Sequence, residues 1–143
     1  MICVDTSFLF ALYGSDVHSP LALDWLGEQD KPLSLTSLNE FELHNALNLA
    51  EFRRLLPLAG AEQYWSHFDQ DRRQGLMVVQ PCNLSEVLGV AKNISQSYTV
   101  AKGYRSFDIL HVAAALQLGA SCFLTFDGNQ KDLAKAEGLC VPF

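Results

Sequence analysis

Short apolar stretches alternate with helical patterns along this chain, and the alternation predicts an α/β fold with a mostly parallel central sheet. Two further observations support this prediction. Hydrophobic residues make up 49% of the sequence and charged residues 18%, which is enough apolar material for a core. The length of 143 residues suits one domain, and no repeat, low-complexity tract or linker divides it. We therefore expect a single domain over residues 1–143.

The expected strands are short apolar runs beside residues that begin or end an element. The first run ends at Asp5-Thr6-Ser7, a sequence typical of a helix N-terminus, and the second begins after Pro32. In chain order the expected strands cover Ile2–Val4, Leu33–Thr36, Leu76–Val79, Cys122–Thr125 and Leu139–Val141.

The expected helices have boundaries that residue preferences explain. Gly14 and Gly119 are typical helix stops, and Pro57 suits the first turn of a helix. In chain order the expected helices cover Phe8–Tyr13, Leu21–Gly27, Ser37–Phe52, Pro57–Arg73, Ser85–Ser97, Phe107–Leu118 and Gly128–Glu137.

The composition also argues against several other classes of protein. No apolar run approaches the roughly 18 residues that a membrane span needs. The N-terminus has no basic region followed by a long apolar stretch, so the expected compartment is the cytoplasm. The four cysteines are scattered without a C-x-x-C pair, and we interpret them as structural residues.

The formal net charge of −6 is unusual for an enzyme that acts on nucleic acid, because phosphate binding normally draws on a basic surface. An acidic chain can still bind RNA if part of its negative charge surrounds bound cations, which reverse the local field. The basic pairs Arg53-Arg54 and Arg72-Arg73 are also consistent with a solvated helix face. Charge alone therefore leaves the function open.

Three aspartates stand where strands end or helices begin. Asp5 and Asp127 each follow an apolar strand, and ligands of open parallel sheets bind beyond the carboxyl ends of strands. Asp108 lies in the first turn of its helix. Each residue also has a structural interpretation, since aspartate caps helices and is favoured near a helix N-terminus. The grouping favours a functional role.

Glu42 is the fourth acid. At about 100° per residue, it falls inside the expected apolar face of its helix, whereas Glu40 falls on the polar face beside His44 and Glu51. A carboxylate on a buried face is costly without a partner, and no basic partner shares this face. The apolar positions used for this assignment are Leu38, Phe41, Leu43, Ala46, Leu49, Ala50 and Phe52.

The four acids indicate a metal site. Mg²⁺ and Mn²⁺ prefer carboxylate oxygens and retain several waters, and a cation relieves the repulsion between clustered acids. Such a site suits hydrolysis of a phosphodiester bond. No serine–histidine or cysteine–histidine pair has comparable support. His111 lies one turn from Asp108 and could face the site, although a lone helix histidine is more often structural.

Four motifs in sequence resemble the PIN-domain family, especially the VapC-type toxins, over almost the whole chain. The motifs are Val4-Asp5-Thr6-Ser7, Glu42-Leu43-x-x-Ala46-Leu47, Asp108-Ile109-Leu110-His111-Val112-Ala113-Ala114-Ala115-Leu116, and Leu124-Thr125-Phe126-Asp127. The resemblance implies a three-layer α/β/α fold and an acidic Mg²⁺ or Mn²⁺ site. It also implies hydrolytic endonuclease action on RNA that leaves a 5′-phosphate and a 3′-hydroxyl.

The same resemblance implies roles and partners for this chain. Asp5, Glu42, Asp108 and Asp127 would be the metal-binding and catalytic residues. Where some relatives have a further acid, this chain has Asn129, which could bind a metal through its carbonyl or leave the position to water. The family also implies an RNA substrate, a homodimer and a cognate antitoxin whose tail blocks the acidic cleft. Supporting or substrate-contacting roles would fall to Thr6, Ser7, Arg105, Thr125 and Asn129.

Two other functions remain open at this point. The first is a catalytically silent PIN-fold module that binds protein or RNA, although such a module has no reason to keep four carboxylates. The second is a phosphotransfer or phosphatase domain with a nucleophilic aspartate at the sheet edge. Such enzymes often have a second aspartate two residues after the first, where this chain has Ser7.

Overall fold

The computed structural model describes residues 1–143 and contains a four-stranded parallel sheet, which confirms the predicted fold class. The strands lie in the order β3-β2-β1-β4. Cys3 pairs with Ser34 on one side and with Phe123 on the other, so β1 is a central strand. The strands are β1 (Ile2–Val4), β2 (Leu33–Leu35), β3 (Met77–Val79) and β4 (Cys122–Leu124).

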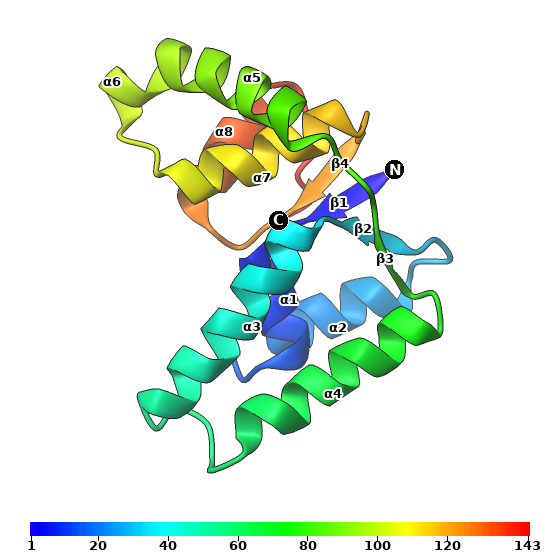
Figure 1. Ribbon diagram of the computed structural model, residues 1–143. Coiled ribbons are helices and arrows are strands. Elements are labelled where there is room, and N and C mark those ends of the chain that lie inside the picture. The colour runs from blue at the N-terminus through cyan, green and yellow to red at the C-terminus, as the bar shows by residue number, and fades with distance from the viewer.

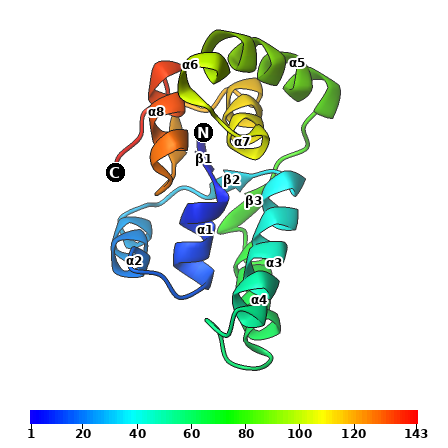
Figure 2. The same cartoon turned by 90° about the vertical axis from the view of Figure 1, so that its left-hand side faces the viewer.

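Helices cover both faces of the sheet and form the outer layers (Figures 1 and 2). One layer contains α1 (Thr6–Tyr13), α2 (Ser19–Gly27), α3 (Ser37–Phe52) and α4 (Gly60–Arg73). The other contains α5 (Leu84–Ile94), a π-helical turn (Ser95–Thr99), α6 (Val100–Lys102), α7 (Ser106–Gln117) and α8 (Gly128–Ala136). No helix is both long enough and apolar enough to span a membrane.

Alternating strand side chains separate the core into two clusters. Val4 and Leu124 pack with Phe8 in the cluster beneath the first helical layer. Cys3 and Phe123, one position away on the same two strands, pack in the cluster beneath the second. This period of two is what a parallel sheet buried on both faces requires. The sheet therefore holds both helical layers at fixed positions around the ends of β1 and β4.

The predicted apolar face of α3 is wrong in phase. Phe41 is 64% exposed and Phe52 is 84% exposed, although both were assigned to the buried side. The buried side chains are those of Asn39, Leu43, Leu47 and Ala50, roughly a quarter of a turn away. Asn39 can be buried because its amide is hydrogen-bonded to Thr36, Val4 and His111. As a result, Glu42 lies half-buried at the edge of this face.

The strand predicted over Leu139–Val141 is reduced to a single bridge between Cys140 and Cys122. Pro142 has no N–H to extend a ladder. The last residue turns toward the first helical layer, where the Phe143 ring lies 4.9 Å from that of Phe126. The chain end thus packs on the core rather than continuing the sheet.

Several helix boundaries differ from the prediction by one or two residues, and two differ by three. The helix expected from Pro57 begins at Gly60, because Pro57 forms a turn with Gly60. Glu51 accepts hydrogen bonds from the N–H groups of Ala59 (3.1 Å) and Ala61 (2.9 Å) and so caps the start of α4 from a neighbouring helix. The helix expected over Ser85–Ser97 ends as α5 at Ile94 and continues as the π-helical turn.

Candidate active site

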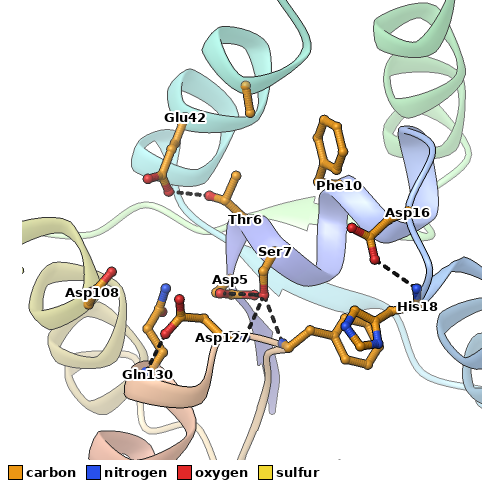
Figure 3. A pocket seen from close by; sticks show the side chains of 12 residues that line it. Asp5, Thr6, Ser7, Phe10, Asp16, His18, Glu42, Asp108, Asp127 and Gln130 are labelled. Carbon is orange, nitrogen blue, oxygen red and sulfur yellow. Dashed lines mark hydrogen bonds between the residues drawn. The ribbon is translucent and has the colours of Figure 1, made fainter. Parts of the chain in front are cut away.

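The four predicted acids line one open cleft at the carboxyl ends of β1 and β4 (Figure 3). Asp5 follows β1, Glu42 comes from the second turn of α3, Asp108 from the first turn of α7, and Asp127 precedes α8. The cleft has a volume of about 440 Å³. Four segments that are distant in sequence therefore bring carboxylates to the sheet edge that the parallel topology favours for ligands.

Asp5 is 0% exposed and is held by three donors. It caps α1 through Phe8 N–H (2.9 Å), and it accepts hydrogen bonds from Ser7 Oγ (2.8 Å) and Thr125 Oγ1 (2.9 Å). Burial raises the pKa of Asp5 to about 6, and these hydrogen bonds limit the rise. The side chain is therefore fixed in position, and its charge is sensitive to conditions in the cleft.

Ser7 and Thr125 join the ends of the neighbouring strands β1 and β4. Ser7 Oγ accepts the N–H groups of Phe126 (2.8 Å) and Asp127 (3.2 Å) while donating to Asp5. Thr125 Oγ1 accepts Asp127 N–H (3.0 Å) and donates to Asp5. These two hydroxyl groups thus fix Asp5 relative to the start of α8.

Glu42 has a basic partner that the sequence did not identify. His111 Nε2 lies 2.5 Å from Glu42 Oε2, and Thr6 Oγ1 donates to the same oxygen. Burial raises the pKa of Glu42, but the hydrogen bonds from His111 and Thr6 favour the charged form and bring the pKa below its usual value. The His111 side chain is 1% exposed, whereas that of Glu42 is 32% exposed to the cleft.

The orientation of His111 follows from its second neighbour, Asn39. Asn39 Nδ2 lies 3.0 Å from the Val4 carbonyl, which can only accept a hydrogen bond, and Asn39 Oδ1 accepts Thr36 N–H (2.8 Å). These contacts make Asn39 Nδ2 the donor to His111 Nδ1 at 3.2 Å. His111 Nδ1 therefore carries the lone pair, and its Nε2–H donates to Glu42.

Asp108 and Asp127 form the opposite wall and are less constrained. Asp108 Oδ2 accepts Arg105 N–H (3.3 Å), and Asp127 Oδ1 accepts Gln130 N–H (2.9 Å). Partial burial raises the pKa of Asp108, the Arg105 N–H opposes this, and the charges of Asp127 and Glu42 raise it further. Each aspartate keeps one carboxylate oxygen without a hydrogen bond from the protein.

The donor set suits a hard divalent cation. The cleft offers carboxylate oxygens, and repulsion among three of the acids favours a positive ion between them. However, no three His, Cys, Asp or Glu side chains are arranged closely enough to hold one ion as they stand. The chemistry of the residues nevertheless fits Mg²⁺ or Mn²⁺.

The remaining predicted residues divide into two groups. Thr6 and Ser7 line the cleft, and Thr125 supports it from behind. Arg105 and Asn129 do not line it, although Arg105 N–H contacts Asp108. Gln130 lies in the wall instead, largely buried, and its Oε1 has no hydrogen-bond partner.

Two parts of the site were not predicted from the sequence: the Asn39–His111 pair, and the cleft wall on which three aromatic rings and Asp16 lie. The sequence shows a histidine one turn after Asp108, but the residues that it contacts on α3 follow only from the correct phase of that helix. The wall comprises Phe10, Asp16, His18 and Phe126. No spacing rule links a loop between two helices with a residue more than 100 positions later, so nothing in the sequence indicated this wall.

A parallel α/β sandwich with an acidic cleft at the carboxyl edge of its sheet defines the structural class of this protein. The family model described as PIN domain matches residues 2–136. The chain therefore belongs to the PIN domain family, and the resemblance found in the sequence is confirmed at that level.

Two solved structures are similar in fold. One is the crystal structure of VapC20 from Mycobacterium tuberculosis, described as a sarcin-ricin loop cleaving toxin. It is 18% identical, with a TM-score of 0.65, over 92% of this chain and 94% of that one. The other is FitAcB from Neisseria gonorrhoeae, 18% identical with a TM-score of 0.61, over 99% of this chain and 96% of that one. No protein with a curated description matches the sequence.

Proposed function

We propose that this protein is a metal-dependent endoribonuclease that hydrolyses RNA phosphodiester bonds, with Asp5, Glu42, Asp108 and Asp127 as its catalytic and metal-binding residues. The observation that carries the proposal is the meeting of these carboxylates in one open cleft. A purely structural helix cap has no need to share a cleft with three other acids.

Charge supports the need for a cation. The chain has a formal net charge of −6, and its candidate site is acidic, so these carboxylates by themselves would repel a phosphodiester. When bound, Mg²⁺ or Mn²⁺ supplies Lewis-acid polarisation of the phosphoryl oxygen and a lowered pKa for an attacking water. Hydrolysis that breaks the P–O3′ bond leaves a 5′-phosphate and a 3′-hydroxyl.

The chain's own residues perform the positioning. Ser7 and Thr125 prevent the Asp5 carboxylate from rotating, because each donates to it. His111 keeps Glu42 charged and directed toward the cleft. Asp108 and Asp127 offer unbonded oxygens on the facing wall. The result is one wall of fixed carboxylates and another that can adjust, which suits a cation that remains partly hydrated.

We infer that the protein is the toxin of a type II toxin–antitoxin pair of the VapC kind, acting as a homodimer on RNA in the cytoplasm. Its activity would be restrained by a cognate antitoxin. The PIN family assignment and the fold shared with VapC20 support this inference.

The test is cleavage of a single-stranded RNA oligonucleotide by the purified protein, with Mg²⁺, with Mn²⁺ and with excess chelator. We expect cleavage only with metal, and products with 5′-phosphate and 3′-hydroxyl ends. Asp127→Asn should reduce the rate at least about 100-fold. The matched control is Asp132→Asn, which changes an exposed acid within α8, the helix that Asp127 caps. Cleavage that persists in chelator would contradict the proposal.

A silent PIN-fold binding module is the second candidate, because no three ligands are pre-arranged around a single point. The same experiment separates the two functions. A module would bind RNA or protein without hydrolysis under any metal condition, and Asp127→Asn would not change its behaviour.

A further inference from the structure

We propose that His18, stacked on Phe126 beside the acids, is the binding surface for an unpaired nucleobase next to the scissile phosphate. This inference rests on the proposed ribonuclease function and names its substrate class, which is RNA with an unstacked base at the cut. The two rings are 4.4 Å apart between centroids and only 9° from parallel. Both residues line the same cleft as the four carboxylates.

The stack is anchored in the core. The Phe126 ring also stacks with that of Phe8, which is fully buried, at 5.6 Å and 19°. Phe143 packs against both rings, at 4.9 Å from Phe126 and 5.8 Å from Phe8. His18 is therefore the outermost ring of a rigid aromatic column, and a ligand that stacks on it need not order the column first.

The outer part of His18 is open to solvent. The residue is exposed, although one of its faces lies on Phe126. Its backbone is held by Asp16, whose carboxylate accepts His18 N–H at 2.8 Å. In Figure 3, His18 lies across the cleft from Asp108, with Asp5 and Asp127 between them. A planar group bound on His18 would thus lie beside the metal ligands without occupying their place.

The backbone connects this surface to the candidate catalytic residues. Phe126 directly precedes Asp127, and its N–H donates to Ser7 Oγ at 2.8 Å. Ser7 in turn donates to Asp5. The distance from the stack to the acids is therefore fixed, which is what alignment of a base and its neighbouring phosphate requires.

The chemistry of the ring column favours a nucleobase. Every base has a π-face, and proteins bind single-stranded RNA by stacking unpaired bases on aromatic or histidine rings. A base inside a duplex already stacks on its neighbours and cannot present that face to the protein. Phe10 adds a third ring to the same cleft, so the wall around the acids is apolar as well as charged.

The experiment compares wild type, His18→Ala, His18→Phe and His67→Ala on a single-stranded RNA that the wild type cuts. His67 is an exposed histidine on α4, outside the cleft, and provides the matched control. We expect His18→Ala to raise KM about tenfold with a smaller effect on kcat. His18→Phe should restore most of the loss, and His67→Ala should have no effect. Thermal unfolding of each variant verifies that it is folded.

The decisive comparison uses the same RNA with an abasic nucleotide beside the cleavage site. The abasic nucleotide should raise the KM of wild type by about as much as His18→Ala does. It should have little further effect in His18→Ala, because both changes remove the same stack. Additive effects of the two changes, or equal cleavage of single-stranded and duplex RNA, would overturn the inference while leaving the nuclease function intact. Failure of the wild type to cut any RNA would overturn both proposals.

Discussion

Asp5 and Glu42 face the same cleft and are both partly or fully buried, yet their pKa values move in opposite directions. Complete burial raises the pKa of Asp5 to about 6, and its three donors, two hydroxyl groups and one N–H, only limit that rise. For Glu42, a ring N–H from His111 and the Thr6 hydroxyl outweigh burial and lower the pKa. The comparison teaches that the balance between burial and hydrogen-bond donors decides whether a site carboxylate stays charged: complete burial outweighs three donors at Asp5, whereas two donors outweigh partial burial at Glu42.

The largest expected effect distinguishes the two glutamates of α3. Glu42→Gln should lower metal-dependent RNA cleavage at least about 100-fold, because it removes a charged oxygen ligand from the cleft. Glu40→Gln should leave the rate within about twofold, because Glu40 lies outside the cleft and approaches only Arg72, at 3.9 Å. Initial rates under identical metal concentrations measure both. The reverse pattern would show that the wrong face of α3 has been assigned to catalysis.

The second prediction concerns His111, the ring N–H donor that lowers the pKa of Glu42 and has no counterpart among the donors to Asp5. His111→Ala should lower metal affinity and cleavage about 10- to 100-fold, as loss of a partner behind a metal ligand typically does. His111→Gln should restore much of this loss, because its amide can still donate to Glu42. Mn²⁺ titrations of activity, together with thermal unfolding, measure the effect. If both variants lose stability equally and metal affinity does not change, His111 has only a structural role.

The third prediction concerns Asp5 and pH. In the metal-free protein, this carboxyl retains its proton up to about pH 6 when folded, whereas the unfolded chain loses it near pH 4. The folded state then binds more protons between these values, so the stability contribution of Asp5 falls as pH rises from 4 to 6. Asp5→Asn should therefore become more stable relative to wild type over this interval, by on the order of 1 to 3 kcal/mol.

Urea unfolding in chelator at about pH 4 and about pH 7 measures that difference. The pKa of Glu42 is lowered, so its contribution has the opposite sign and is lost as the pH falls. In the same experiment, Glu42→Gln should lose stability relative to wild type between about pH 4 and about pH 7. The reason is that the charged Glu42 stabilises the wild type increasingly as pH rises. Parallel pH profiles for the two variants would contradict the comparison.

The smallest expected effect is that of replacing Asp108, on the cleft wall opposite Asp5 and Glu42. Asp108→Asn removes one of the mutually repelling charges, so the metal-free variant should unfold at the same temperature as wild type or about 1–3 °C higher. It should also lose most of the stabilisation that millimolar Mn²⁺ gives wild type. A purely structural Asp108 predicts lower stability without metal and an undiminished metal response. Thermal unfolding with chelator and with Mn²⁺ distinguishes these outcomes.

The sheet and the four acids could be predicted from sequence because their causes are local. Apolar runs identified β1 to β4, and parallel strands place their carboxyl ends at one edge, which brought Asp5 and Asp127 together. Ser37–Phe52 was predicted with its observed bounds. Asp108 was identified by its place in the first turn of its helix and Glu42 by the expected phase of α3, and the family motifs supported both. These inferences needed only periodicity, helix caps and the order of motifs.

The detailed environment of the site could not be predicted, because it depends on tertiary partners. Asn39 is a polar residue in the buried row of α3, and its contacts with Val4 and His111, beyond the helix cap that it forms with Thr36, explain its place. The apolar appearance of Phe41 and Phe52 shifted the predicted face, although both are exposed. The structure does place Glu42 in the cleft, as predicted. The helical phase from which that placement was argued is wrong.

Metal binding tests the central claim most directly, because it asks whether the four carboxylates act as one site. We would measure Mn²⁺ binding by isothermal titration calorimetry to wild type and to Asp5→Asn, Glu42→Gln, Asp108→Asn and Asp127→Asn, with Glu40→Gln as the control. Each of the four substitutions should weaken binding about tenfold or more, and the control should bind as wild type does. Binding that all four substitutions leave unchanged, or that Glu40→Gln weakens equally, would contradict the account.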